Sequence, residues 1–133
     1  MFKKFIKPVY AHCDIPCGIY ETDTLKHAAD TCLRMVEKIE ELGAIDSVEK
    51  HNNFVRMVMV KEKHAGKAKR ELYILWSDYF KPEHLDKFPA LHDVFWAAAK
   101  QASRVKQTLN KDECLKLIEQ VAKVDEIFKN SKK

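Results

Sequence analysis

The chain has 133 residues, 46% of them hydrophobic, which is enough for one domain with one core and makes a second domain unlikely to fit. Its 24 basic and 20 acidic residues leave a formal charge of +4, and its lysine pairs are interleaved with glutamates, which argues against the basic face of a nucleic-acid-binding protein. No apolar run approaches the roughly 20 residues of a membrane span, and four cysteines without a secretory signal indicate a reducing compartment, which we expect to be the cytoplasm.

The first segment with distinctive chemistry is His12-Cys13-Asp14-Ile15-Pro16-Cys17-Gly18-Ile19-Tyr20, which we call the hook. An imidazole directly precedes the first of two thiols, and the proline allows the backbone to turn so that all three groups close on one ion. Thiolate and imidazole ligands favour zinc, copper, nickel or iron. The same spacing also fits a reduced pair of surface thiols or a disulfide, and spacing alone does not choose between these readings.

After the hook, the apolar residues recur at helical spacing and no window alternates as a strand does, so the sequence predicts an all-α fold. A first helix is expected to begin near Thr22 or Asp23, as its N-cap, and to end at Gly43. Its predicted core stripe consists of Leu25, Ala29, Cys32, Val36 and Ile39.

A second helix is expected to begin between Ser47 and Asn53 and to run as far as Tyr79. Gly66 is its weak point, because glycine costs about 1 kcal/mol there relative to alanine. The sequence therefore predicts one long helix with a bend near Gly66, or two collinear pieces. Its apolar positions include Phe54, Val58, Leu72, Leu75 and Trp76, and we expect Trp76 to pack inside the bundle.

Two further helices complete a predicted four-helix bundle over residues 21–133. Pro89 suits the first turn of the third helix, and Asn110 provides a box-like cap for the fourth. Cys32 and Cys114 lie on apolar helix faces, where free cysteine is usually a small buried hydrophobe. The histidines among charged residues are expected to be solvated: His27, His51, His84 and His92.

A second motif, Trp76-Ser77-Asp78-Tyr79-Phe80-Lys81-Pro82, follows much later in the chain. Together with the hook, this motif resembles the nickel superoxide dismutase family, and the similarity extends over most of residues 12–133. The resemblance implies a four-helix bundle preceded by a metal-binding hook, assembled as a homohexamer with one nickel ion per subunit. It also implies the reaction 2 O2•− + 2 H+ → O2 + H2O2, with nickel cycling between Ni(II) and Ni(III).

In this family the histidine of the hook is the first residue of the mature enzyme. The resemblance therefore implies that residues 1–11 are a leader removed by a dedicated maturation peptidase, which frees the α-amine of His12. Loss of Lys3, Lys4 and Lys7 leaves 21 basic against 20 acidic residues, so the formal charge falls from +4 to +1. A nearly neutral mature chain again argues against binding to nucleic acid.

The ligand set implied by the resemblance is the amine and imidazole of His12, the amide nitrogen and thiolate of Cys13, and the thiolate of Cys17. Anionic donors of this kind lower the potential of nickel enough to make Ni(III) reachable, and a square-planar arrangement of N and S suits Ni(II). The imidazole of His12 is expected to join as an axial ligand on oxidation.

Other hook residues have expected supporting roles. Pro16 turns the chain, with a cis Ile15–Pro16 bond as one possibility. Gly18 lets the backbone approach the sulfur atoms. Asp14 and Tyr20 are expected to order the hook and to gate access to it.

Tyr79 and Lys81 match family positions near the entrance, where a phenol can hold water and a cation can attract the anionic substrate. One departure from the family concerns the support of the axial imidazole, because Ala28 and His64 stand where better-known members have a Glu and an Arg. His64 could orient the His12 imidazole, alone or through water, or it could be an ordinary surface histidine.

Two alternatives from other classes remain at this stage. A nickel or copper carrier could use the same hook to transfer metal without turnover. A non-catalytic helical bundle with a redox-sensitive thiol pair would bind no metal after loss of the leader.

Overall fold

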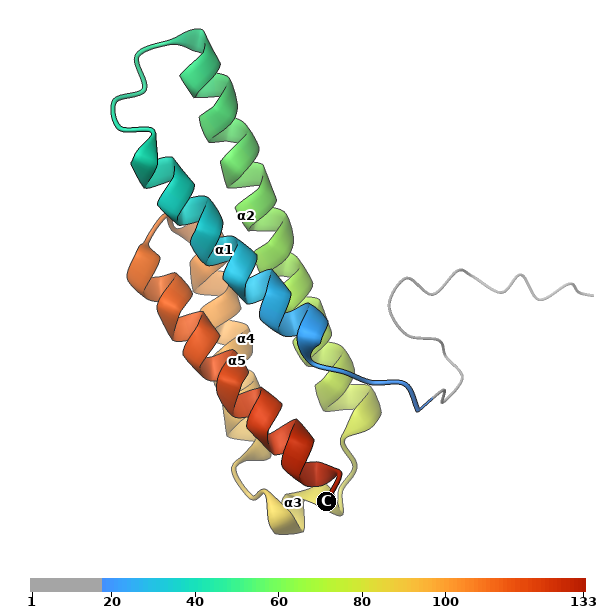
Figure 1. The fold of residues 1–133 in the computed structure, drawn as a ribbon. Helices are drawn as coiled ribbons and strands as arrows, with labels where there is room; N and C mark the ends of the chain where they lie inside the picture. Colours follow the sequence, from blue (N-terminus) through green and yellow to red (C-terminus); the bar gives the residue numbers. More distant parts are fainter. Residues whose placement is uncertain (1–17) are drawn as a thin grey trace, which may run out of the picture.

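The computed structural model describes residues 18–133, and four long helices in this part of the chain form a bundle (Figure 1). α1 packs on α2 and α5, and α4 packs on the same two helices, so each long helix has two neighbours. The predicted all-α bundle is confirmed, and none of these helices is long and apolar enough to cross a membrane. The elements are α1 (Asp23–Glu41), α2 (Val48–Ile74), the π-helical turn η1 (Leu75–Tyr79), the short α3 (His84–Lys87), α4 (Leu91–Gln107) and α5 (Lys111–Ser131).

The ends of α1 and the start of α2 follow from local sequence. Gly43 adopts a φ of +62°, a left-handed conformation that glycine takes readily and that ends the first helix as predicted. The Ser47 hydroxyl accepts a hydrogen bond from the backbone N–H of Lys50 at 3.1 Å and so caps α2. α2 then runs as one continuous helix through Gly66, so of the two predicted alternatives the single long helix is confirmed and the two collinear pieces are not found.

The second half of the chain agrees with prediction at α5 and differs at α4. The Asn110 side chain accepts from the backbone N–H groups of Asp112 and Glu113 at 2.8 and 3.2 Å, which confirms the cap. α4 begins only at Leu91, so Pro89 precedes the helix instead of occupying its first turn. The Phe88 backbone ends α3 at that point in a non-helical conformation, which displaces the start of α4.

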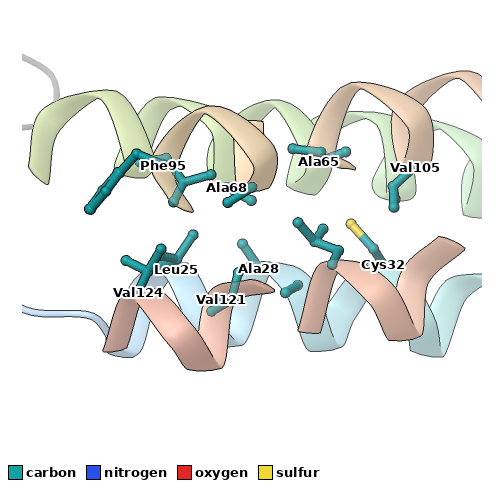
Figure 2. Close-up of a cluster of buried hydrophobic side chains, with 14 of the residues drawn as sticks. Leu25, Ala28, Cys32, Ala65, Ala68, Phe95, Val105, Val121 and Val124 are labelled. Atoms are coloured by element: carbon teal, nitrogen blue, oxygen red, sulfur yellow. The ribbon is translucent and has the colours of Figure 1, made fainter. Parts of the chain in front are cut away.

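The core runs along the axis of the bundle, where α1 and α5 face α2 and α4 (Figure 2). Cys32 and Cys114 are 0% and 1% exposed and carry free thiols, as predicted. Trp76 is 45% exposed, so its predicted place inside the bundle is wrong. Phe54 and Val58 are only half-buried, because the α1–α2 hairpin extends past the ends of α4 and α5 at that end of the molecule.

One charged residue lies in this core, which periodicity alone did not reveal. Lys61 is 2% exposed, and its ammonium group donates to the backbone carbonyls of Val105, Lys106 and Thr108, each at 2.7 Å. Burial lowers the pKa of Lys61, and the charge of Glu62 opposes that shift. The last carbonyls of a helix lack hydrogen-bond partners within the helix. The Lys61 side chain supplies donors to these carbonyls and so caps the C-terminal end of α4.

Candidate functional site

Two motifs that lie far apart in the chain meet at the start of α1. The ring of Tyr20, the last residue of the hook, lies with its centroid 5.4 Å from that of Tyr79, the last residue of η1, and the two planes are inclined at 56°. Aromatic pairs favour such tilted contacts at this separation. The structure therefore brings together Tyr20, which was expected to gate access, and Tyr79, which was expected near the entrance.

Tyr79 is held from several sides. Its hydroxyl oxygen lies 2.7 Å from Ser131 Oγ on α5, its ring centroid is 4.8 Å from that of Phe128, and its ring stacks on His84 with 16° between the planes. His84 is half-buried in this stack, so the prediction that it is solvated is wrong. Tyr79 is consequently a fixed support against which Tyr20 rests.

The π-turn of η1 sets the position of Tyr79. The Phe80 N–H donates to the Leu75 carbonyl at 3.1 Å, one residue further back than in an α-helix, and Phe80 then continues in an extended conformation. Leu75 and Phe80 are both buried, at 1% and 8% exposure, while Tyr79 between them is half-buried. Single π-turns are frequent at functional sites, where they re-aim a side chain.

The remaining members of the second motif lie at the surface. Lys81 is exposed, and its backbone N–H donates to Nδ1 of His84 at 2.9 Å, so the residue has a fixed backbone and a side chain that reaches into solvent. The Trp76 indole N–H donates to Nδ1 of His92 at 2.9 Å. Trp76 thus contributes to a surface groove between α2 and α4, which it lines together with His92 and Trp96.

Residues 18–22, which we call the hook root, are anchored to α5 by Thr22. The Thr22 side chain, 4% exposed, donates to Asp125 at 2.5 Å instead of capping α1. Lys26 and Lys129 pair with the same carboxylate at 3.5 and 2.7 Å. Burial opposes ionisation of Asp125, but the hydrogen bonds from Lys129 and Thr22 and the charge of Lys26 outweigh it, so the pKa of Asp125 is lowered.

The hook root also contains the first residue that the structure describes. Gly18 has a φ of +70°, in the left-handed region that side chains disfavour. The expectation that Gly18 lets the backbone approach the sulfur atoms stays a prediction, because both cysteines of the hook lie outside the described residues. Sequence reasoning identified Gly18 and Tyr20 but missed Asp125, because nothing in the sequence of α5 signals a contact with Thr22 more than a hundred residues away.

The structure places Ala28 and His64, the two expected departures from the family pattern, on adjacent helices. Ala28 is 0% exposed and belongs to the core, where α1 packs against α2. His64 is half-buried on α2, and its Nδ1 lies 2.9 Å from the Val60 carbonyl, to which it donates. Its ring faces that of His27 on α1, with 6.4 Å between the two centroids.

The proposed ligands His12, Cys13 and Cys17, with Asp14 and Pro16, lie outside the described residues. Within residues 18–133 no group of three or more His, Cys, Asp and Glu side chains could hold a metal ion. Burial raises the pKa of Cys32 to about 12 and that of Cys114 to about 11, so both core thiols stay protonated at neutral pH. Because the two core cysteines stay protonated, only the two cysteines of the hook are left among the four to supply thiolates. Thiolates, together with an imidazole and backbone nitrogen, are donors that suit nickel.

Comparisons with known proteins agree with this arrangement. The family model described as nickel-containing superoxide dismutase matches residues 7–132. The superoxide dismutase [Ni] of Streptomyces seoulensis is 35% identical over 125 residues, which cover 94% of this chain and 91% of that protein. The corresponding enzyme of Streptomyces coelicolor is 34% identical over the same length, with the same coverage.

Solved structures show the same similarity in three dimensions. A native structure of nickel superoxide dismutase superposes with a TM-score of 0.82 at 34% identity and covers 92% of this chain and 100% of the other. A structure with nickel ligation of the oxidised state gives a TM-score of 0.82 at 33% identity. The arrangement of helices is therefore shared along with the sequence.

Proposed function

Because this chain belongs to the nickel-containing superoxide dismutase family, it is a nickel-dependent superoxide dismutase, and we propose that its active site is the hook, residues 12–20. The enzyme converts two superoxide anions and two protons into dioxygen and hydrogen peroxide. The observation that best supports the hook as the site is the contact between Tyr20 and Tyr79, since it joins the two motifs typical of the family.

The proposed nickel ligands are His12, through its amine and imidazole, Cys13, through its amide nitrogen and thiolate, and Cys17, through its thiolate. Bound nickel supplies the one-electron couple that the reaction needs. The free amine requires removal of residues 1–11, so in this proposal maturation by a peptidase precedes metal binding. The hook and the leader then form separate units of the chain, and residues 21–133 form the bundle.

The chain's own side chains have proposed roles around the hook. Tyr20 and Tyr79 restrict access and hold water, and the fixed packing of Tyr79 keeps both phenols in place. Lys81 attracts the anionic substrate from solvent, an effect that weakens with ionic strength. Gly18 allows the backbone to reverse, and Asp14 and Pro16 order the turn.

His64 is proposed to orient the imidazole of His12. Donation from its Nδ1 to the Val60 carbonyl leaves Nε2 to accept a hydrogen bond from a second group, directly or through water. Outer partners of this kind fix the orientation and basicity of a metal-bound imidazole. The buried Ala28 has no polar atom in its side chain with which to share that task.

The cellular setting is also a proposal. The content of four cysteines supports a reducing compartment, and we propose the cytoplasm. The resemblance to the family supports the proposal of a homohexamer. Both are separate from the chemistry of the hook and can fail without affecting it.

Nickel content and dismutase activity of protein that begins at His12 test the proposed function. We expect one nickel ion per chain and turnover of superoxide that depends on it. A nickel or copper carrier would bind metal without superoxide-dependent turnover, and a bundle with a redox-sensitive thiol pair would bind none. Metal binding without turnover would contradict the dismutase function, and a lack of bound metal would contradict the hook as the nickel site.

A further inference from the structure

Two histidines from different helices face each other where α1 packs on α2. His27 lies in the second turn of α1 and His64 lies on α2, and their ring centroids are 6.4 Å apart with the planes inclined at 56°. His27 is exposed and His64 is half-buried, so the space beside the rings is accessible from solvent. No part of the superoxide reaction described above uses His27.

The separation of the rings fits a shared metal ion. A bond from an imidazole nitrogen to zinc is about 2.0–2.1 Å long, so two rings on one such ion have centroids roughly 4.5–6.5 Å apart, depending on the angle at the metal. The observed 6.4 Å is reached when the angle between the two metal–nitrogen bonds is about 180°, so the rings are spaced as a trans pair on one ion.

The hydrogen bond of His64 favours the same reading. Its Nδ1 donates to the Val60 carbonyl at 2.9 Å, which fixes the tautomer and leaves the lone pair on Nε2. Metal-bound histidines commonly donate their other N–H to a backbone carbonyl in this way. Asp23 lies one turn before His27, is exposed and pairs with Lys26 at 3.4 Å, so in this proposal the two imidazoles are the protein ligands and water completes the coordination.

We propose that His27 and His64 form a second binding site for a divalent transition metal ion, distinct from the hook and weaker than it. A trans pair of imidazoles suits the square-planar or tetragonal coordination of nickel and copper, whereas zinc prefers tetrahedral sites and calcium and magnesium prefer oxygen ligands. The lone pair on Nε2 of His64 can bind a metal ion or accept one hydrogen bond, but not both. A metal bound here therefore competes with any contact between His64 and His12. His27→Ala is therefore the cleaner test, since it removes the second site alone.

The experiment is a calorimetric titration of Ni²⁺ into nickel-loaded mature protein. We expect a second equivalent to bind, and we expect its affinity to fall by more than about ten-fold in His27→Ala and in His64→Ala. His51→Ala is the matched control, because His51 lies on the same helix and makes the same bond to a carbonyl one turn back, with Ser47 at 2.9 Å. Its second equivalent should be unchanged.

The outcomes separate this site from the function of the hook. Loss of the second equivalent in His27→Ala with unchanged dismutase activity supports the proposal. Absence of a second equivalent in the parent protein, its survival in His27→Ala, or an equal loss in His51→Ala overturns it. Failure of the hook as the active site would appear instead in the first equivalent and in turnover.

Discussion

The two pairs of cysteines in this chain belong to regions of opposite character. Cys32 and Cys114 lie in the core of the bundle, where burial raises their pKa and keeps them as thiols. Cys13 and Cys17 belong to the hook, among a proline, a glycine and a histidine that suit a metal-binding turn. The same side chain is thus a small hydrophobe in one region and a proposed metal ligand in the other.

In this account the hook supplies the metal ligands, and the bundle holds the hook in place. The bundle contributes the packing of Tyr79 and the anchor between Thr22 and Asp125, and both lie at the end of the segment that carries the proposed ligands. Substitutions in the hook should therefore change activity and leave stability intact. Substitutions in the core should do the reverse.

The largest expected effect is the loss of a hook thiolate. Cys13→Ser or Cys17→Ser removes a soft anionic donor, so we expect dismutase activity to be abolished while helical circular dichroism is unchanged. Cys32→Ala and Cys114→Ala are the matched controls, and they should retain nickel and activity and lose roughly 1 kcal/mol of stability each. Retained turnover in either serine variant would mean that the ligands are assigned wrongly.

His64→Ala should give a smaller loss of activity. Removal of a group that orients a metal-bound imidazole typically costs about ten- to a hundred-fold, so we expect turnover to fall by that factor with nickel still bound. Pulse-radiolysis turnover and the electron paramagnetic resonance spectrum of the oxidised enzyme measure the two effects. Unchanged rates and an unchanged axial nitrogen coupling would show that His64 does not support His12.

Lys61→Met tests whether a substitution in the core lowers stability without changing activity. It leaves the carbonyls of Val105, Lys106 and Thr108 without their shared donor, so we expect the free energy of unfolding to fall by about 2 kcal/mol. Activity per nickel should not change. Urea unfolding measures the effect, and Lys63→Met, at an exposed position on the same helix, serves as the control. Equal midpoints for the two variants would argue against a structural role for the buried ammonium.

Asp125→Asn probes the anchor of the hook root and has a defined pH dependence. The folded-state pKa of Asp125 is lowered, so its stabilisation is present above the unfolded pKa of about 3.9 and is lost as the pH falls through the folded value. We expect the variant to be about 1 kcal/mol less stable at pH 7, with the difference shrinking as the pH falls well below 4. Glu119→Gln, which removes an exposed ion pair with Lys123, should change stability by less than about 0.5 kcal/mol.

Parallel unfolding curves at neutral and acid pH measure that difference. A stability gap between Asp125→Asn and the parent that is the same at both pH values would mean that the charge of Asp125 is not what anchors Thr22. A loss of activity without a loss of stability would place Asp125 closer to the chemistry than the structure does.

Much of the fold was predictable because helical periodicity and caps are local signals. Gly43, Ser47 and Asn110 ended or began helices close to where the sequence placed them. The burial of Lys61 was not predictable, because the carbonyls that accept its hydrogen bonds lie more than forty residues away.

In the candidate site, too, the residues could be predicted from local motifs, whereas their contacts could not. Tyr20 and Tyr79 were identified from motifs, and their contact was not, since it depends on how the segment before α1 lies against η1. The π-turn that aims Tyr79 has no signature in the sequence of Leu75 to Tyr79. The pairing of His27 with His64 likewise required the register between α1 and α2.

The most direct test of the account compares mature protein that begins at His12 with protein that retains Ala11, both supplied with nickel. The account predicts equal helix content and thermal stability of the bundle, with dismutase activity only in the chain whose first residue is His12. Equal dismutase activity in the two proteins would contradict it, because the amine of His12 would then play no part in binding nickel.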